Sequence, residues 1–215
     1  MAIIVLDPGH GGTARLGGSS PNNAVSRPRG ILEKHLTLEV ARRAKALLQA
    51  AGHAVWLTRN ADVNVALADR AALAARKRAD IFVSIHFNGW TNAAAQGTET
   101  FSWPGAPSRS ERLSQALLAK AVQATGYRNR GAKRETFGVI DPSRHLAITA
   151  ACLVELSFIT DPAEDARLDD AAYLQRLGEA IAAGGEAYLA SQFPRPPARR
   201  AEDGVTARTG ERDPA

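Results

Sequence analysis

The stretch VLDPGHGG, Val5 to Gly12, decides how the rest of the chain is interpreted. A short apolar run ends there in aspartate and proline, and a histidine follows among three glycines. The run Ile3 to Asp7 predicts a β-strand, and the residues after it predict a loop at its carboxyl end. Glycine lets a backbone approach a bulky or charged group closely, and a histidine at neutral pH can bind a metal or move a proton. The stretch therefore predicts a strand that leads into a functional loop.

Beyond this loop, short apolar runs alternate with helical patterns. The order of these elements predicts an α/β fold: a single domain with a largely parallel mixed sheet flanked by helices on both faces. Helices are expected from Leu36 to a stop at Gly52, over Leu67 to Lys77, from a capping box at Ser108 to Glu111 as far as Gly126, and around Leu174 to Tyr188. Strands are expected at Ile3–Asp7, Ala54–Thr58, Asp80–His86, Thr98–Ser102 and Ala151–Phe158.

Length and charge limit the possibilities further. The chain has 215 residues, of which 45% are hydrophobic, so it can form one substantial core. We expect one domain over residues 1–193 and a disordered tail, rich in proline and arginine, over residues 194–215. The net charge of +5 and the pI near 9.8 could attract nucleic acid, anionic lipid or an acidic cell-wall polymer. Aromatic residues do not alternate with the basic ones as a stacking platform requires, so we expect no nucleic-acid partner.

The sequence carries few signals of compartment. Its single cysteine, Cys152, excludes an intramolecular disulfide and is most simply a small core residue. The N-terminus lacks the basic region of a signal peptide, and no segment reaches the roughly 18 apolar residues of a membrane span. We therefore expect a soluble monomer with no membrane insertion and no export signal in this sequence.

Four ionisable residues fall near one edge of the predicted sheet, where ligands of α/β folds usually bind. His10 follows the first strand, and His86 ends the run DIFVSIH. Glu155 lies late in CLVELSF, and Glu33 opens the first helix. All four side chains can bind a metal or move a proton.

Each of the four also has a structural interpretation. His10 could be a turn residue, and His86 could be a hydrogen-bonded histidine at a strand end. Glu33 could simply interact with the dipole of its helix. Glu155 fits a structural role least well, because an ionised carboxylate inside an apolar strand is costly unless a cation or hydrogen bonds compensate. A nearby metal would supply the cation.

The other histidines are weaker candidates. His35 would point about 200° away from Glu33 on a helix, so the two cannot face one ion. His53 precedes a strand at the opposite edge of the sheet. His145 lies in a loop that could contact a substrate.

Competing motifs in the opening loop fail on their context. Gly9, Gly11 and Ala14 match the dinucleotide fingerprint, but no helix begins within them and no acid ends the second strand. The sequence contains no G-x-S-x-G elbow, no P-loop and no H-E-x-x-H motif. A metal site would have to be assembled from distant residues.

Five segments in succession carry a family resemblance. They resemble the signatures of the zinc-dependent N-acetylmuramoyl-L-alanine amidases of the amidase-3 family, over about residues 2–190. The resemblance implies hydrolysis of the amide between N-acetylmuramic acid and L-alanine in peptidoglycan. It also implies one Zn²⁺ per chain bound by His10, Glu33 and His86, with Glu155 as the catalytic glutamate. The segments are LDPGHGG, ILEKHLTLEVARRAKALLQAAGHAVWLTR, ADIFVSIHFNG, RGAKRETFGVI and LVELSFITDPAEDARL.

The chain departs from the family pattern at two places. The loop after His10 contains SSPNNAVSRPRG where the family often has a shorter glycine-rich link, and ELSFITD replaces the more usual Glu-(Leu/Ile)-Gly-Phe-(Leu/Ile)-(Ser/Thr)-Asn. The four functional positions are intact. The shape of the cleft and the preferred stem peptide stay open.

The implied chemistry suits these residue types. Two imidazoles and one carboxylate give zinc three protein ligands and leave a position for water, as catalytic zinc sites require. We expect Glu155 to take a proton from that water and deliver it to the departing nitrogen. Asn88 is expected to bind substrate or support the metal site, and Arg59 and Arg70 to pair with Asp7 or Asp62 as structural clamps. The run RNRGAK, Arg128 to Lys133, is expected to be a basic edge facing the wall.

A second hypothesis is a peptidoglycan-binding module with an amidase-like fold and no activity. The intact His10, Glu33, His86 and Glu155 argue against it, because loss of any one marks a degenerate enzyme. We expect action on the cell wall, in the periplasm or outside the cell. An autolysin, a phage endolysin and an exported toxin are all compatible with the sequence.

Overall fold

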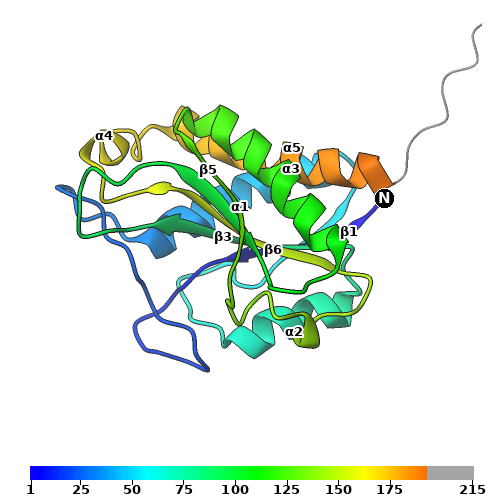
Figure 1. Ribbon diagram of the computed structural model, residues 1–215. Helices are drawn as coiled ribbons and strands as arrows, with labels where there is room; N and C mark the ends of the chain where they lie inside the picture. The colour runs from blue at the N-terminus through cyan, green and yellow to red at the C-terminus, as the bar shows by residue number, and fades with distance from the viewer. Residues whose placement is uncertain (193–215) are drawn as a thin grey trace, which may run out of the picture.

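The computed structural model describes residues 1–192 (Figure 1). The tail predicted over residues 194–215 therefore lies outside the described residues. The elements follow one another in the order β1 (Ile3–Pro8), α1 (Glu33–Ala50), β2 (Ala54–Leu57), α2 (Leu67–Lys77), β3 (Ile81–Asn88), β4 (Thr98–Ser102), α3 (Ser108–Thr125), β5 (Asn129–Arg134), the 3₁₀ turn η1 (Pro142–Arg144), β6 (Ala150–Phe158), α4 (Pro162–Asp165) and α5 (Ala171–Gln192). Among the described residues, no helix is both long enough and apolar enough to cross a bilayer.

The six strands form one mixed sheet in the order β2-β1-β3-β6-β4-β5. Every pair is parallel except β4 with β6, which is antiparallel. The predicted α/β fold with a largely parallel mixed sheet is confirmed. From β1 the chain crosses through α1 to β2 on one side, and from β2 it returns through α2 to β3 on the other. The carboxyl ends of β1 and β3 therefore form a topological switch point, where α/β folds usually bind ligands.

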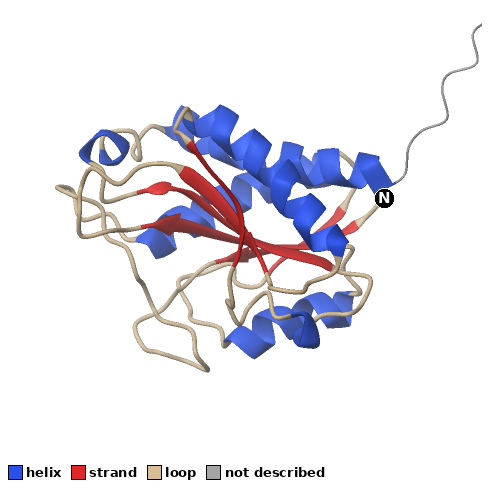
Figure 2. Ribbon diagram, in the orientation of Figure 1, coloured by secondary structure: helices blue, strands red, loops and turns tan. Residues whose placement is uncertain are grey.

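Helices cover both faces of the sheet, as Figure 2 shows. The large core lies between the sheet and helices α1, α3 and α5, and α5 packs against both α1 and α3. A smaller core lies on the opposite face, under α2 and the segment around Val139 and Ile140. Because strand side chains alternate between faces, Ile81, Val83 and Ile85 of β3 enter the large core while Phe82 enters the smaller one.

The face with the smaller core changes character along the strands. Phe82 and Leu153 are apolar near the strand starts, whereas Ser84, His86 and Glu155 follow on the same face by alternation. The polar residues thus share the carboxyl half of one face. Alternation in β3 and β6 therefore gives this part of the sheet the side chains that a site requires.

Three local features differ from the sequence-based expectations. Strand β5 was not predicted, and neither was the short helix α4. The capping box at Ser108 is wrong, because Pro107 is the N-cap and no side chain caps the helix. Glu111 instead accepts hydrogen bonds from Arg134 in β5. The predicted helix ends hold, since the chain leaves α1 and α3 through Gly52 and Gly126, which have positive φ of 87° and 71°.

Candidate metal centre and active site

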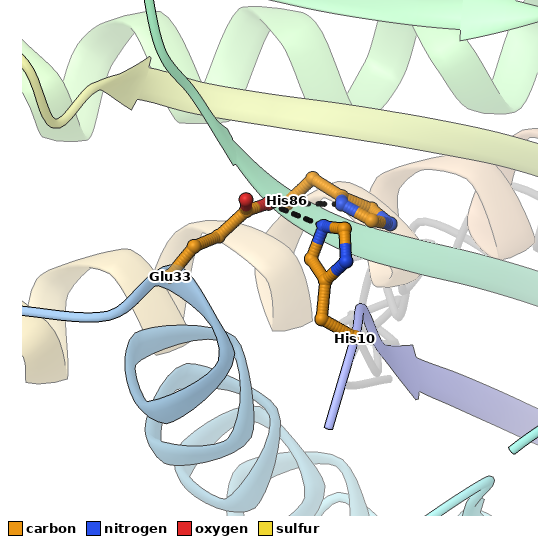
Figure 3. A group of neighbouring side chains, drawn as sticks. All are labelled: His10, Glu33 and His86. Atoms are coloured by element: carbon orange, nitrogen blue, oxygen red, sulfur yellow. Dashed lines mark hydrogen bonds and ion pairs between the residues drawn. The ribbon is translucent and has the colours of Figure 1, made fainter. Parts of the chain in front are cut away.

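The fold brings together three of the four residues that the sequence singled out (Figure 3). His10 lies in the loop directly after β1, Glu33 is the first residue of α1, and His86 lies in β3. One ligand atom from each lies within 4.8 Å of the others. Glu155 is the register partner of His86 in the neighbouring strand β6 and lines the same cavity.

The distances between these three side chains suit one small cation. Nε2 of His10 lies 3.1 Å from Oε1 of Glu33, and Nδ1 of His86 lies 3.0 Å from the same oxygen. In a tetrahedral zinc site with metal–ligand distances of about 2.0–2.1 Å, ligand atoms stand about 3.3 Å apart. The two imidazole rings meet edge to face, with centroids 4.8 Å apart. Two imidazoles and a carboxylate are a donor set typical of catalytic zinc.

The tautomer of His10 is fixed by its neighbour Ser20. Nδ1 of His10 lies 3.1 Å from the carbonyl oxygen of Ser20, which can only accept, so Nδ1 carries the proton. In the neutral ring Nε2 then presents a lone pair. This Nε2 is buried and has no hydrogen-bond partner within residues 1–192. A buried acceptor without a partner is costly, and a cation at the triad would satisfy it.

His10 also has an uncommon backbone conformation. Its φ is 63°, in the left-handed region that residues other than glycine rarely occupy. Such strain costs about 1–3 kcal/mol and is found mainly at functional sites. Gly11 follows with φ of 130°, and a Cβ there would lie 2.1 Å from the backbone oxygen of Val63. The loop therefore needs glycine beside His10 to hold the ring in place.

The carboxylate of Glu33 is fixed at both oxygens. The amide of Ala24 donates to Oε2 at 3.0 Å, and the amide of Phe87 donates to Oε1 at 3.1 Å. Burial alone would raise the pKa of Glu33, but its contacts with His10 and His86 outweigh burial and lower that pKa to about 2. Glu33 is therefore ionised at every pH near neutrality, as a metal ligand must be.

His86 is held against the backbone of the opening loop. A Cβ on Gly9 would lie 2.2 Å from Cε1 and 2.5 Å from Nε2 of the His86 ring, so a side chain at position 9 would occupy the space of that ring. Burial lowers the pKa of His86, although Glu33 acts in the opposite direction. The ring is therefore neutral at pH 7, which is the form that binds a metal.

Two buried arginines hold the loop that carries His10. Arg70 pairs with Asp7 at 2.7 Å and donates to the carbonyls of Pro8 and His10 at 2.8 and 2.9 Å. Arg59 donates to the carbonyls of Pro8 and Gly9 at 3.0 and 2.9 Å. Arg70 is thus a clamp on Asp7 as expected, whereas Arg59 binds backbone carbonyls rather than an acid.

Asp7 gains further support from the strands beside it. Ser84 donates to its Oδ2 at 2.7 Å, and Thr58 donates to its Oδ1. Burial acts to raise the pKa of Asp7, but Arg70 and these hydroxyls outweigh it, so that pKa lies below its ordinary value. The aspartate that ends the first strand therefore anchors the loop and stays ionised.

Glu155 lies beside the triad, and no lysine or arginine among residues 1–192 forms an ion pair with it. Its Oε2 is buried and has no hydrogen-bond partner in the described part of the chain. Burial, together with the carboxylates of Glu33 and Glu99, raises the pKa of Glu155 well above its ordinary value. A divalent cation at the triad would favour the ionised form of Glu155. The cluster of three carboxylates fits a site built around positive charge.

Glu99 is the site residue that the sequence did not reveal. It lies in β4 opposite Glu155, and Arg130 donates to its Oε2 at 2.8 Å, with Lys133 on the same oxygen. Its Oε1 accepts a hydrogen bond of 2.7 Å from Asn88. Two cations of the predicted basic edge therefore neutralise an acid beside the site. Alternation in TETFS places Glu99 on this face, but only the pairing of β4 with β6 shows its neighbour.

Of the remaining candidate residues, Asn88 lines the larger cavity, whereas the other three histidines lie outside the triad. Asn88 lines the cavity but already binds Glu99. His35 lies outside the triad and 3.9 Å from Asp62. His53 bonds Glu186 at 2.7 Å, and His145 bonds the carbonyl of Val139 at 2.9 Å.

An open cavity of about 480 Å³ lies against Glu33, His86 and Glu155. Its volume falls within the range of pockets that bind small ligands. Trp90, 63% exposed, and Val25, 41% exposed, lie on its walls. A smaller cavity of about 170 Å³ is lined by His10 and His86. The three residues of the triad are thus shared between two neighbouring cavities, and His86 lines both.

Comparison with known proteins points to one family. Residues 4–186 match the family described as N-acetylmuramoyl-L-alanine amidase. The chain is 32% identical over 186 residues to N-acetylmuramoyl-L-alanine amidase LytC of Bacillus subtilis, which covers 86% of this chain and 35% of that protein. It is 32% identical over 232 residues to N-acetylmuramoyl-L-alanine amidase AmiA of Escherichia coli, covering 87% of this chain and 76% of that one. The chain spans only about a third to a half of the first curated relatives, 35% and 52% of their lengths.

Solved structures agree with the sequence relatives. The catalytic domain of CwlV, an N-acetylmuramoyl-L-alanine amidase from Bacillus (Paenibacillus) polymyxa var. colistinus, matches with a TM-score of 0.77 and 30% identity, over 88% of this chain and 98% of that one. An N-acetylmuramoyl-L-alanine amidase from Clostridium difficile 630 matches with a TM-score of 0.79 and 30% identity, over 89% and 98% of the two chains. This chain therefore matches almost the whole length of both solved chains, 98% of each.

Proposed function

This chain belongs to the N-acetylmuramoyl-L-alanine amidase family, and on that premise we propose that it hydrolyses the amide between N-acetylmuramic acid and L-alanine in peptidoglycan with the help of one zinc ion. The observation that carries the proposal is the convergence of His10, Glu33 and His86 from three distant parts of the chain. The reaction breaks a C–N bond and consumes one water molecule.

The proposed metal ligands are His10, Glu33 and His86. The Nε2 atom of His10 supports this assignment. It is buried beside the carboxylate of Glu33 and no group in residues 1–192 donates a hydrogen bond to its lone pair, so a bound cation would satisfy both atoms. Zinc bound there would polarise the amide carbonyl and lower the pKa of an adjacent water from about 15.7 toward about 7. The hydrogen bonds from Ala24 and Phe87 to Glu33, and from His10 to Ser20, hold the ligands in position.

Glu155 is the proposed general base and acid. Its carboxylate lies on the strand beside His86 and faces the cavity, so it can take the proton from the attacking water. It then delivers that proton to the nitrogen of the departing alanine, which leaves as a free amine. Burial raises the pKa of Glu155 and so makes its carboxylate a stronger base, because no donor in residues 1–192 stabilises the charge on Oε2.

The test of this role is Glu155→Gln, which keeps the shape of the side chain and removes its ability to accept a proton. We expect turnover of peptidoglycan to fall by about 10²–10⁴-fold, with zinc content and melting temperature close to the wild type. Glu111→Gln makes the same chemical change on the surface, where Glu111 pairs with Arg134, and should leave the rate unchanged. A Glu155→Gln protein with full activity would remove Glu155 from the mechanism.

The proposed site of action is the cell wall, in the periplasm or outside the cell. The relatives named above are N-acetylmuramoyl-L-alanine amidases by name, and the net charge of +5 suits an anionic wall polymer. We further propose that residues 1–193 form the catalytic domain and that residues 194–215 take no part in the reaction.

A further inference from the structure

Arg27 is the one lysine or arginine among the described residues that line the larger cavity. The same cavity is lined by Glu33, His86 and Glu155, where the proposed reaction takes place. A guanidinium that lines a reaction cavity can bind a carboxylate of the substrate through two parallel hydrogen bonds.

The position of Arg27 depends on the same hairpin that presents Glu33. Val25 forms an antiparallel bridge with Leu32, and the amide of Glu33 donates to the carbonyl of Ala24 at 3.1 Å. Ser26 is buried, and its Oγ accepts a hydrogen bond of 2.9 Å from the amide of Ile31. The backbone before Arg27 is therefore fixed relative to a metal ligand, although its side chain is exposed.

The two arginines of the segment SRPRG have different surroundings. Arg29 is paired, since its Nε lies 2.9 Å from Asp165 and its Nη1 contacts Asp169. Arg27 makes neither an ion pair nor a side-chain hydrogen bond within residues 1–192, and Arg29 does not line the cavity. The guanidinium of Arg27 is thus available to a bound anion, whereas that of Arg29 serves the fold.

The chemistry of the substrate indicates which anion this is. The lactyl carboxyl of muramic acid forms the amide that is hydrolysed. The muramic acid therefore has no free carboxylate next to the reacting bond. The stem peptide does carry one, on the residue that follows L-alanine. An arginine on the cavity wall therefore marks the side on which the peptide lies.

We propose that Arg27 determines specificity by binding the free α-carboxylate of the second stem residue, so that the protein prefers stems with D-glutamate over stems in which that carboxylate is amidated. This inference rests on the proposed amidase function and names the substrate class of the same site. A bidentate guanidinium–carboxylate contact distinguishes the two stems, because the neutral amide cannot accept in the same geometry and carries no charge.

The experiment uses the zinc-loaded full chain and two muramoyl tetrapeptides that differ only in D-glutamate or D-isoglutamine at the second position. The kcat/KM of the wild type should be about tenfold higher for the glutamate stem. Arg27→Gln should lower kcat/KM for that stem alone and bring the ratio close to one, and Arg27→Lys should retain part of the preference. Arg76→Gln removes the same charge from the exposed end of α2, outside the cavity, and should keep the wild-type ratio.

The outcomes separate this inference from the proposed function. If the wild type cleaves both stems with equal kcat/KM, or if Arg27→Gln keeps the preference, the assignment of Arg27 is wrong while the amidase activity stands. If the zinc-loaded wild type cleaves neither these stems nor polymeric peptidoglycan, both the assignment and the proposed function are wrong. A preference lost in Arg27→Gln and kept in Arg76→Gln supports the assignment.

Discussion

Replacing Gly9 with alanine tests the link between the opening loop and the metal site most sharply. Gly9 does not have a positive φ, so alanine meets no backbone penalty of that kind. Its Cβ, however, would lie 2.2 Å from Cε1 of His86, where an ordinary contact begins at 3.4 Å. The ring would have to retreat by about 1.2 Å, the difference between those two distances.

A shift of that size is large for a metal ligand. Zinc–nitrogen distances lie at about 2.0–2.1 Å and deviate by only about 0.2 Å in real sites. We therefore expect Gly9→Ala to weaken zinc binding by at least about 10–100-fold and to lower kcat/KM by about 100-fold or more. The free energy of unfolding should fall by about 1–3 kcal/mol through overpacking.

The assay is competition for zinc with a chromogenic chelator, followed by turnover at saturating zinc. Gly185→Ala is the matched control, because its Cβ would lie 3.3 Å from the flexible end of Ile81 in the core and far from the proposed ligands along the sheet. It should bind zinc as the wild type does. If Gly9→Ala binds zinc as tightly as the wild type, the position of the His86 ring does not require a residue without a side chain at position 9.

Three further predictions concern the clamp, the cavity wall and the tail. Asp7→Asn leaves the buried Arg70 unpaired and should lower the free energy of unfolding by about 3–5 kcal/mol at pH 7 in urea titrations. The pKa of Asp7 is lower in the folded state than in the unfolded chain, so the ionised carboxylate stabilises the fold fully above about pH 4, and this stabilisation is lost as the pH falls through the folded pKa. The free energy of unfolding of Asp7→Asn should therefore fall less than that of the wild type when the pH is lowered below about 4. Trp90→Ala removes an exposed aromatic from the cavity wall and should raise KM about fivefold with unchanged zinc content, whereas an unchanged KM would exclude contact with substrate. A chain that ends at residue 193 should keep kcat/KM within about twofold and Tm within about 2 °C, and a larger loss would mean that residues 194–215 support the domain.

The sequence predicted those parts of the fold that depend on local periodicity. Strand β4 and helix α2 have the expected bounds. The threonines and phenylalanine of TETFS favour a strand, and the apolar spacing of α2 over three turns favours a helix. Strand β5, NRGAKR, could not be predicted this way. It is an edge strand whose polar residues form no apolar pattern, and its pairing with β4 depends on the rest of the sheet.

The site shows the same division between local and distant information. The position of His10 and His86 after parallel strands predicted that they would lie at one edge, since parallel strands end together. The roles of Ser20 and Gly9 depend on contacts that no local pattern encodes: a carbonyl that fixes the His10 tautomer and a bare backbone against the His86 ring. Glu99 was missed because its partners Asn88 and Arg130 come from β3 and β5, which are separated in sequence and reach Glu99 only in the folded sheet.

The charge around Glu155 explains why the site needs a cation. Glu33 and Glu99 both act to raise the pKa of Glu155, and Glu99 is already compensated by Arg130 and Lys133. The ionised Glu33 is in hydrogen-bond contact with two backbone amides and with Nδ1 of the neutral His86 ring, so positive charge is lacking on its side of the cluster. An ion at the triad would supply it and leave Glu155 as an ionised base.

Incubation of purified peptidoglycan with the protein, with and without a chelator, addresses the central claim most directly. Released fragments are analysed by mass spectrometry after labelling of free amino termini, and zinc is added back to the chelated sample. The account predicts stem peptides with a free N-terminal L-alanine when zinc is present, none after chelation, and recovery on addition of zinc. Release of the same stems by the metal-free protein, or cleavage at another bond by the zinc-loaded protein, would contradict it.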